Sequence, residues 1–581
     1  MEQKLSYYIT KAKELKINDN DKKIRIALLS SFTINGIEET FRVKCAERNI
    51  ECQTYLAGYN QYFQNILDDQ SDLYKFSPDL TFLLLDTRSI LGNLFHFPYS
   101  ISSSERTTFI ETKFKELSNL INTFTKKTNS KLIVTNFSIP SFSPYGISET
   151  KQEYGLKSMI IDLNNKLESE FMQNDSVYIY DFNSFVAKFG ENNMFDFKQY
   201  FFGDIKVCLD YIPHLVNDLM AYVIASLGLG KRCIVLDLDN TLWGGIVGED
   251  GFDGIKLGNT PPGNAYQEFQ RVLLSLYQRG VLLAINSKNN PEDALKVINE
   301  HPDMILKKEH FACLKINWDD KVTNMKEIAE DLNFGLDYMV FFDDDPVNRE
   351  FVKTRLPQVL TVDLPKDPSQ YSKILQNMSE FNTLSITEED TKRGKMYLEQ
   401  QQRKQFESFA TNLEDFLKEL NLKVSILPAD QFTIPRISQL TLKTNQFNLT
   451  THRYQEEEIR EFVQNNQFLV GCAQVEDKFG DNGITGVFIV KKDTPKQWTL
   501  DTFLLSCRVM GREVEKAIIS HIIKKAKENG VERIRAQYIP TQKNKPVESF
   551  LPDCGFVKEG DYWYYSKPDF KAPGFLTIDE K

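Results

Sequence analysis

Carboxylates, hydroxyls and lysines follow apolar runs in the middle of the chain. The run at 234–236 ends in Asp237, with Asp239 two positions on and Thr241 after it. Residues i and i+2 of a strand point the same way, and open α/β sheets bind ligands beyond the carboxyl ends of their strands. Two carboxylates released together can hold a divalent cation, and one of them can attack an electrophile.

Three further polar groups follow in order along the chain. Ser287 and Lys288 end a second apolar run, Lys321 begins a helical pattern, and Asp343 and Asp344 end a last run. A single doubly wound sheet would bring all of them to one edge. Two sets of carboxylates favour a hard cation, which we expect to be Mg²⁺. A serine and a lysine beside it would bind the oxygens of a phosphoryl group, so the pattern predicts phosphoryl transfer.

The alternative is that these acids only cap helices and end strands in solvent. We expect that role for Asp337 and Asp345. For Asp237 and Asp239 it would leave two like charges without compensation, so we favour the chemical role there. For Asp344 a metal ligand and a more distant supporting position both stay open.

The four elements together resemble the haloacid dehalogenase (HAD) superfamily, whose motif DxDx(T/V) is matched by 237–241. The resemblance implies that Asp237 is a nucleophile forming an aspartyl-phosphate and that Asp239 is the general acid and base. It also implies that Ser287 and Lys321 steady the phosphoryl group. The implied Mg²⁺ ligands are Asp237, Asp343, Asp344 and the backbone carbonyl of Asp239, and the implied substrate-binding residues are Thr241, Lys288 and Asn289. The gaps between the elements are too short for a large cap domain, which suits a large or partner-delivered substrate.

More specific segments resemble the FkbH-like subgroup of this superfamily. They are TLWGGIVGEDG, SKNN, VFFDDDPVNRE, ITEEDTKRGKMY, LTLKTNQFNLTTHRY and SCRVMGREVE. The resemblance implies an acyl phosphate substrate such as 1,3-bisphosphoglycerate, with the glyceryl group passing to an acyl carrier protein. One departure is Asn286, where we expect a cysteine in glyceryl-transferring members. Cys233 and Cys313 lie in apolar runs and are expected in the core.

Two other functions therefore stay open. One is a HAD phosphatase that acts on a small or carrier-bound phosphate ester. The other is a non-catalytic scaffold that binds a carrier protein in a biosynthetic complex.

The apolar runs predict an α/β, multidomain chain. We expect a flavodoxin- or SGNH-like parallel sheet at 1–229 and a HAD-like Rossmannoid sheet without a large cap at 230–380. The stretch 386–420 predicts a helical connector, to which we assign the limits 381–420. It would precede an α+β GNAT-like domain at 421–581. The expected strands are 24–32, 79–86, 131–136, 176–181, 233–238, 281–286, 310–314, 339–343, 422–427, 468–475, 484–491 and 498–505, with helices at 108–128 and 511–529.

The C-terminal domain resembles GNAT acyltransferases in the turn that begins at Arg508 and contains Gly511. The resemblance implies coenzyme A or a carrier-borne phosphopantetheine at a helix N-terminus. Glu513 stands where a small residue is expected and brings a negative charge to the phosphate position, which disfavours coenzyme A. Lys443 and Asn445 belong to a polar run that is either a ligand-facing loop or an ordinary surface loop.

The N-terminal domain resembles SGNH hydrolases. The resemblance implies Ser30 or Ser31 as nucleophile, Asn136 as oxyanion donor and His214 as the triad histidine near Asp210. The usual glycine-rich serine turn is missing, so we favour a degenerate domain that orients partners.

The composition and the absence of targeting patterns argue against several classes of partner and location. Lys and Arg total 70 against 81 Asp and Glu, a net charge of −11, which argues against a nucleic-acid partner. The eight cysteines form no CxxC pair, as in reduced thiols of an intracellular protein. No segment predicts a signal peptide or a membrane span. We therefore expect a cytoplasmic protein without a membrane partner.

Overall fold

The computed structural model describes residues 2–15, 22–409, 413–567 and 569–581. Residue contacts divide the chain into two compact units, Met1–Val223 and Ile224–Lys581. The division lies a few residues before the expected boundary at 229/230. The second unit holds both the expected central and C-terminal domains, so the finer domain limits stay predictions.

The first unit is built on a parallel sheet with strand order β2-β1-β3-β4-β5. Its strands are β1 (Lys22–Ser30), β2 (Ile50–Leu56), β3 (Leu80–Leu84), β4 (Lys131–Thr135) and β5 (Val177–Tyr180). The three middle strands β1, β3 and β4 are apolar and largely buried, as expected for a parallel sheet covered by helices on both faces. The longer helices of this unit are α1 (Leu5–Glu14), α2 (Ile37–Ala46), α6 (Ser103–Lys127), α7 (Leu156–Phe171), α8 (Phe182–Phe189) and α11 (Ile212–Ser226), the last of which crosses the division. Shorter ones are α3 (Tyr62–Leu67), α4 (Asp72–Phe76), α5 (Thr87–Leu91), α9 (Glu191–Met194) and α10 (Phe197–Gly203).

The second unit begins with another parallel sheet, of order β10-β9-β6-β7-β8. Its strands are β6 (Cys233–Leu236), β7 (Leu282–Lys288), β8 (Phe311–Asn317), β9 (Met339–Phe342) and β10 (Leu360–Thr361). Strand β6 lies in the middle, with β7 and β8 on one side and β9 and β10 on the other. The chain therefore leaves β6 in one direction and returns to its other side, which is the topology that opens a ligand crevice at the carboxyl ends of the strands.

Helices cover both faces of this sheet. They are α12 (Val247–Asp250), α13 (Gly263–Gln278), α14 (Pro291–Glu300), α15 (Lys321–Leu332), α16 (Pro346–Arg355) and α17 (Tyr371–Gln376). The side chains of the sheet contribute to two separate apolar clusters, one on each face. Only α12 and α13 lie between β6 and β7 in the described chain, so no large cap is inserted there.

A third, mostly antiparallel sheet completes the second unit. Its order is β17-β18-β16-β15-β14-β13-β11-β19, with β12 paired to β15. The strands are β11 (Lys423–Pro428), β12 (Phe447–Asn448), β13 (Phe468–Asp477), β14 (Gly480–Thr494), β15 (Gln497–Leu505), β16 (Arg533–Ala536), β17 (Val557–Glu559), β18 (Tyr562–Tyr565) and β19 (Thr577–Glu580). The helices are α20 (Ile434–Lys443), α21 (Glu456–Gln464), α22 (Val514–Glu528) and α23 (Phe550–Asp553).

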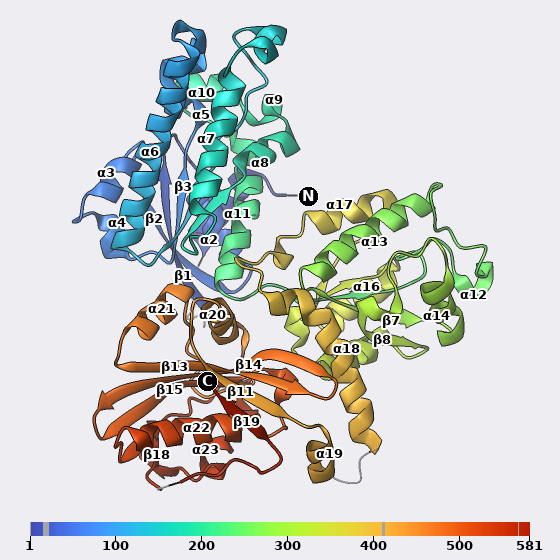
Figure 1. Ribbon diagram of the computed structural model, residues 1–581. Helices are drawn as coiled ribbons and strands as arrows, with labels where there is room; N and C mark the ends of the chain where they lie inside the picture. The colour runs from blue at the N-terminus through green and yellow to red at the C-terminus, as the bar shows by residue number, and fades with distance from the viewer. Residues whose placement is uncertain (1, 16–21, 410–412, 568) are drawn as a thin grey trace. The chain divides into compact units, whose positions relative to one another are not determined.

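The expected helical connector corresponds to α18 (Glu388–Phe409) and α19 (Leu413–Glu419). Residues 410–412 of that prediction lie outside the described chain. Helix α18 packs against β8 and β14 and so contacts both sheets of the second unit (Figure 1).

The α/β multidomain class with parallel sheets is confirmed. The SGNH assignment of the first unit stays a prediction, because a parallel sheet covered by helices is shared by many folds. Among the described residues, no helix is both long and apolar enough to cross a membrane.

Candidate active site

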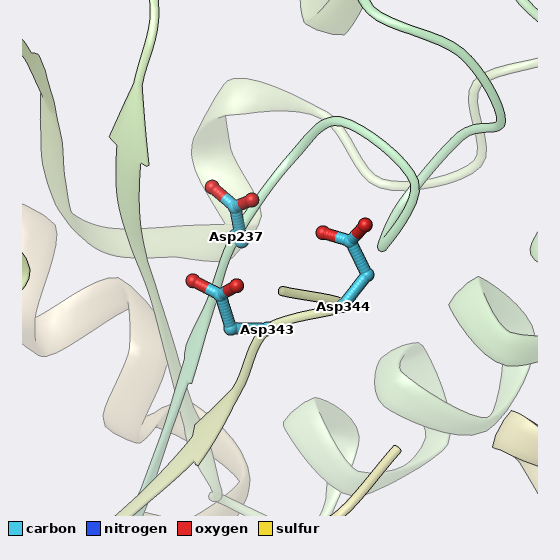
Figure 2. Close-up of side chains that lie close together, drawn as sticks. All are labelled: Asp237, Asp343 and Asp344. Carbon is cyan, nitrogen blue, oxygen red and sulfur yellow. The ribbon is translucent and has the colours of Figure 1, made fainter. Parts of the chain in front are cut away.

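The candidate site lies at the carboxyl edge of the second sheet, where β6 ends between β7 and β9. Leu236 pairs with Ile285 of β7 and with Phe342 of β9, so the residues that follow all three strands meet at one edge. The backbone N–H of Asp237 donates to the carbonyl of Phe342 at 2.9 Å, which ties the two strand ends together. Figure 2 shows Asp237, Asp343 and Asp344 at these adjacent ends.

The three carboxylates form a cluster in which one oxygen of each lies within 4.8 Å of the others. Asp343 is fully buried and Asp237 is 8% exposed. Burial, together with the charge of Asp237, raises the pKa of Asp343 to about 6, and burial with both neighbouring charges raises that of Asp344 to about 7. The negative charges of the three carboxylates are therefore not fully balanced by positive charge nearby.

Lys321 supplies part of that positive charge. It is the first residue of α15, whose N-terminus is capped by the Asp320 carboxylate through the N–H groups of Val322 and Thr323. Its Nζ lies 2.7 Å from Asp237 Oδ1 and 3.1 Å from Asp343 Oδ2. Burial disfavours the protonated form of Lys321. The negative charges of Asp237 and Asp343 outweigh this effect, so the pKa of Lys321 is raised.

Asn286 holds this lysine in position. Its carbonyl accepts a hydrogen bond from Lys321 Nζ at 2.7 Å, and its Nδ2 donates to the carbonyl of Lys321 at 2.9 Å. Asn324 Nδ2 donates to Asn286 Oδ1 at 3.0 Å and to Asn317 Oδ1 at 2.9 Å. From the sequence, Asn286 was only a departure from an expected cysteine. A polar residue inside the apolar run of β7 was the available signal of its role.

Asp239 is held by the loop that follows β6. Its Oδ1 accepts hydrogen bonds from Trp243 Nε1 at 2.8 Å and from the N–H of Val247 at 3.1 Å, and its Oδ2 accepts one from Asn289 Nδ2 at 2.8 Å. Burial raises the pKa of Asp239, against these hydrogen bonds. The contact from Trp243 was not anticipated from the sequence.

The other predicted residues of this site lie as follows. Ser287 is buried near the end of β7, and Lys288 beside it is exposed. Thr241 is fully buried, and its hydroxyl has no hydrogen-bond partner within the described chain. The roles of these residues in substrate binding stay predictions.

The donor set suits a hard divalent cation. Asp237, Asp343 and Asp344 offer carboxylate oxygens from two adjacent strand ends, as Mg²⁺ prefers. Asp343 Oδ2 is buried and accepts no well-aligned hydrogen bond from the described residues, although Lys321 Nζ is nearby. The carboxylate of Asp239 is not one of the three in this cluster, and the role of its backbone carbonyl as a ligand stays a prediction.

In the first unit, the predicted hydrolase residues are engaged in local contacts. Ser30 Oγ accepts from the N–H of Phe32, Ser31 Oγ accepts from the N–H of Asp86, and Asn136 Nδ2 donates to Asp181 Oδ1. The ring of His214 packs against Phe189 and Tyr211. Among the described residues no hydrogen bond joins His214 to Ser30 or Ser31. The hydrolase site stays a prediction.

In the C-terminal part, Lys443, Asn445 and Arg508 line one cavity of about 370 Å³. Gly511 does not line it. Gly511 has φ +78° and open space where a Cβ would stand, within the turn that leads to α22. The ligand of this turn stays a prediction.

Comparisons with known proteins find similarity in the N-terminal part of the chain and to one larger solved structure. Residues 25–224 match the family model described as FkbH, N-terminal domain. A solved structure of the N-terminal part of the protein BF1531 from Bacteroides fragilis, which contains a phosphatase domain and is complexed with Mg, is 29% identical. It covers 66% of this chain and 100% of its own, with a TM-score of 0.61. No curated protein matches the chain.

Acetyltransferase structures are similar over about a quarter of the chain. A GNAT-family acetyltransferase from Staphylococcus aureus is 14% identical, covers 26% of this chain and 99% of its own, and has a TM-score of 0.20. The IAA acetyltransferase from Bacillus cereus is 18% identical, covers 24% of this chain and 79% of its own, and has a TM-score of 0.18. At these values the similarity assigns no activity to this chain.

Proposed function

We propose that the chain is a Mg²⁺-dependent phosphoryl-transfer enzyme of the HAD type, acting through an aspartyl-phosphate on Asp237. The observation that carries the proposal is the cluster of Asp237, Asp343 and Asp344, the first two of them buried, with Lys321 in contact with those two. The similarity to a phosphatase-containing structure complexed with Mg supports the same reaction class.

The chain's own residues suit the steps of this reaction. An oxygen of Asp237 attacks phosphorus while the bond from phosphorus to the leaving oxygen breaks. Asp239, with a raised pKa, donates its proton to that leaving oxygen. Water then attacks the aspartyl-phosphate while Asp239 takes its proton, which releases phosphate and restores both carboxyl groups. Lys321, supported by Asn286, bears positive charge beside the nucleophile.

A bound Mg²⁺ would be held by Asp237, Asp343 and Asp344 and would neutralise charge on the phosphoryl oxygens. The reaction does not need a large cap over the site, and none is inserted between β6 and β7. This openness favours a substrate that is large or that is delivered by a partner.

The test is hydrolysis of an aryl phosphate and of acetyl phosphate with and without Mg²⁺, using Asp237→Asn as the matched variant. Asparagine keeps the size of the side chain and removes the nucleophilic charge. We expect Mg²⁺-dependent phosphate release that falls at least about a thousandfold in Asp237→Asn. Beryllofluoride should bind the native chain in the presence of Mg²⁺ and not the variant. A chain that neither releases phosphate nor binds Mg²⁺ would be the carrier-binding scaffold instead.

A second candidate is transfer of the acyl group of an acyl phosphate, such as 1,3-bisphosphoglycerate, to an acyl carrier protein. The open site favours it. At position 286, however, the amide side chain holds Lys321, so no thiol is available there as a protein-bound acceptor. The acceptor thiol would be the phosphopantetheine thiol of the carrier, which attacks the acyl carbon while phosphate leaves.

Incubating the protein with 1,3-bisphosphoglycerate and a carrier protein separates the two candidates. A mass increase of the carrier by one glyceryl group supports transfer. Phosphate release without that mass increase supports hydrolysis alone.

A further inference from the structure

A cavity of about 370 Å³ lies between the parallel and the antiparallel sheet of the second unit. The residues around it come from the starts of β6, β7 and β9, from the end of α15, and from α18, α20 and the segment after β15. Its polar lining includes Asn333, Tyr338, Arg232, Arg393, Arg436, Gln439, Lys443, Asn445, Arg508 and Lys543.

This cavity is at the opposite edge of the sheet from the carboxylate cluster. Arg232 directly precedes β6, whereas Asp237 directly follows it. Tyr338 and Asp343 flank β9 in the same way. The members of each pair are five residues apart along the strand, a length of about 17 Å at about 3.3 Å per residue. The cavity is therefore a separate place from the phosphoryl-transfer site.

The lining is strongly cationic. It contains five arginines and lysines from the interior, Arg232, Arg393, Arg436, Lys443 and Arg508, together with Lys543 at the rim. None of the described residues that line it is an aspartate or a glutamate. Side chains of one sign in a cavity this small repel each other strongly, because little water screens them.

Among the described residues, two of these cations form ion pairs with neighbouring acids. Arg393 forms an ion pair with Asp390, and Lys543 forms one with Asp337 at 2.9 Å. In the part of the chain that the structure describes, no carboxylate lies within ion-pair distance of the other four cations, which are Arg232, Arg436, Lys443 and Arg508.

The contacts of these four cations are to neutral groups. Arg232 donates to the carbonyl of Lys443 at 3.2 Å and lies over the ring of Tyr338 at 4.0 Å. Arg508 Nε donates to Ser506 Oγ at 3.3 Å, and Arg436 donates to Gln439. The ammonium of Lys443 makes no hydrogen bond to any described residue.

The protonation of these groups reflects the crowding. Burial lowers the pKa of Lys443 well below its usual value, and Arg393, Arg232 and Arg436 lower it further. Burial and the charge of Arg508 lower the pKa of Arg436 to about 9. Keeping these side chains protonated in the cavity therefore costs free energy, and a bound anion would offset that cost.

We propose that this cavity is a second ligand site that binds a small organic phosphate carrying at least two negative charges. The guanidinium groups of Arg232, Arg436 and Arg508 present planar donors that suit phosphate oxygens, and Lys443 adds a point charge. The amides of Gln439 and Asn445 can bind hydroxyl groups, and Phe334, Tyr397 and Leu440 offer apolar surface to the organic part. The volume suits a compact metabolite-sized molecule.

The test is binding of inorganic pyrophosphate to the full chain by calorimetry, in EDTA and at low salt so that metal binding at the carboxylate cluster does not contribute. The variants are Lys443→Met in the cavity and Lys491→Met as the control. Lys491 lies on β14, is exposed and carries the same charge. We expect pyrophosphate to bind the native chain and Lys491→Met alike, and Lys443→Met at least tenfold more weakly.

Thermal unfolding gives a second readout that a merely structural lysine would not produce. Without anion, Lys443→Met should melt at or above the temperature of the native chain, because it removes a repelled charge. With pyrophosphate, the native chain should rise in melting temperature and the variant should not. Cys507 also lines the cavity, so pyrophosphate should slow its alkylation as measured by mass spectrometry.

Three outcomes would overturn the proposal. One is a native chain that shows no binding of pyrophosphate at millimolar concentration. Another is equal binding by Lys443→Met and Lys491→Met. The third is tighter binding of citrate than of pyrophosphate, which would make the ligand a polycarboxylate. Arg436→Gln is the second cavity variant if Lys443→Met does not fold, and the same weakening is expected.

Discussion

Asn286 contacts Lys321 at both ends of the lysine. The carbonyl of Asn286 accepts from Nζ at 2.7 Å, and the amide of its side chain donates to the lysine carbonyl at 2.9 Å. The start of α15 and the end of β7 are thereby joined across the site. The arrangement aims the ammonium at Asp237 instead of leaving it to rotate on its flexible stem.

Replacing Asn286 by alanine should lower kcat by about tenfold with little change in KM, because the start of α15 that carries Lys321 loses its side-chain tie to β7, although the backbone carbonyl that accepts from Nζ remains. Unfolding free energy should fall by about 1–3 kcal/mol, since Asn324 and the carbonyl of Lys321 lose buried partners. Steady-state kinetics and urea unfolding measure the two effects. Asn290→Ala, an exposed neighbour, is the control. A rise in KM with unchanged kcat would contradict a positioning role.

Lys321→Met should destabilise the metal-free protein by about 3–5 kcal/mol, because it leaves Asp237 and Asp343 buried without their cation. Saturating Mg²⁺ should restore much of this loss, since a ligand that binds only the folded state stabilises it by about 2.7 kcal/mol at a hundred times its Kd. Urea unfolding with EDTA and with Mg²⁺ measures the difference. The idea fails if the loss is the same under both conditions.

Asp344→Asn should weaken Mg²⁺ binding by an order of magnitude or more, because it removes one of the three proposed carboxylate ligands. Its neighbour Asp345 offers a matched control. Asp345 caps α16 by accepting from the N–H of Val347 at 2.9 Å, so Asp345→Asn should change stability slightly and leave Mg²⁺ affinity near the native value. Calorimetric titration of both variants with Mg²⁺ decides the point, and equal affinities would remove Asp344 from the ligand set.

His452 should make stability depend on pH. A hydrogen bond with Asp501 raises the pKa of His452, against burial. The stabilisation by the protonated ring is therefore fully present below the unfolded-state pKa of about 6.5 and is lost as pH rises through the higher folded-state pKa. The ring is well exposed, so the effect should stay below about 1 kcal/mol.

His452→Gln should thus lower the melting temperature more at about pH 5.5 than at about pH 8.5. A deficit of equal size at both values would mean that the pair with Asp501 does not depend on the charge of the ring.

The buried strands were predictable because parallel strands covered on both faces are continuous apolar runs. The predicted ranges 131–136 and 233–238 each lie within a few residues of β4 and β6. Strand β2 was missed, because it is an edge strand whose sequence, IECQTYL, mixes polar and apolar residues and is only partly buried. The last strands, from β16 on, were missed because each is only three or four residues long.

The sequence by itself determined the order and spacing of the acids, the serine and the lysine that follow the apolar runs. Those positions are local properties, because the apolar runs and the polar residues at their ends are set by the order of residues along the chain. Only the tertiary structure decided that Lys321 lies between Asp237 and Asp343, that Asn286 supports it, and that Trp243 folds back onto Asp239. It alone also gathered Arg232, Arg436 and Arg508 around one cavity. These contacts join residues that are distant in the chain or carried on a folded loop, so they depend on how helices and sheets pack rather than on any local pattern.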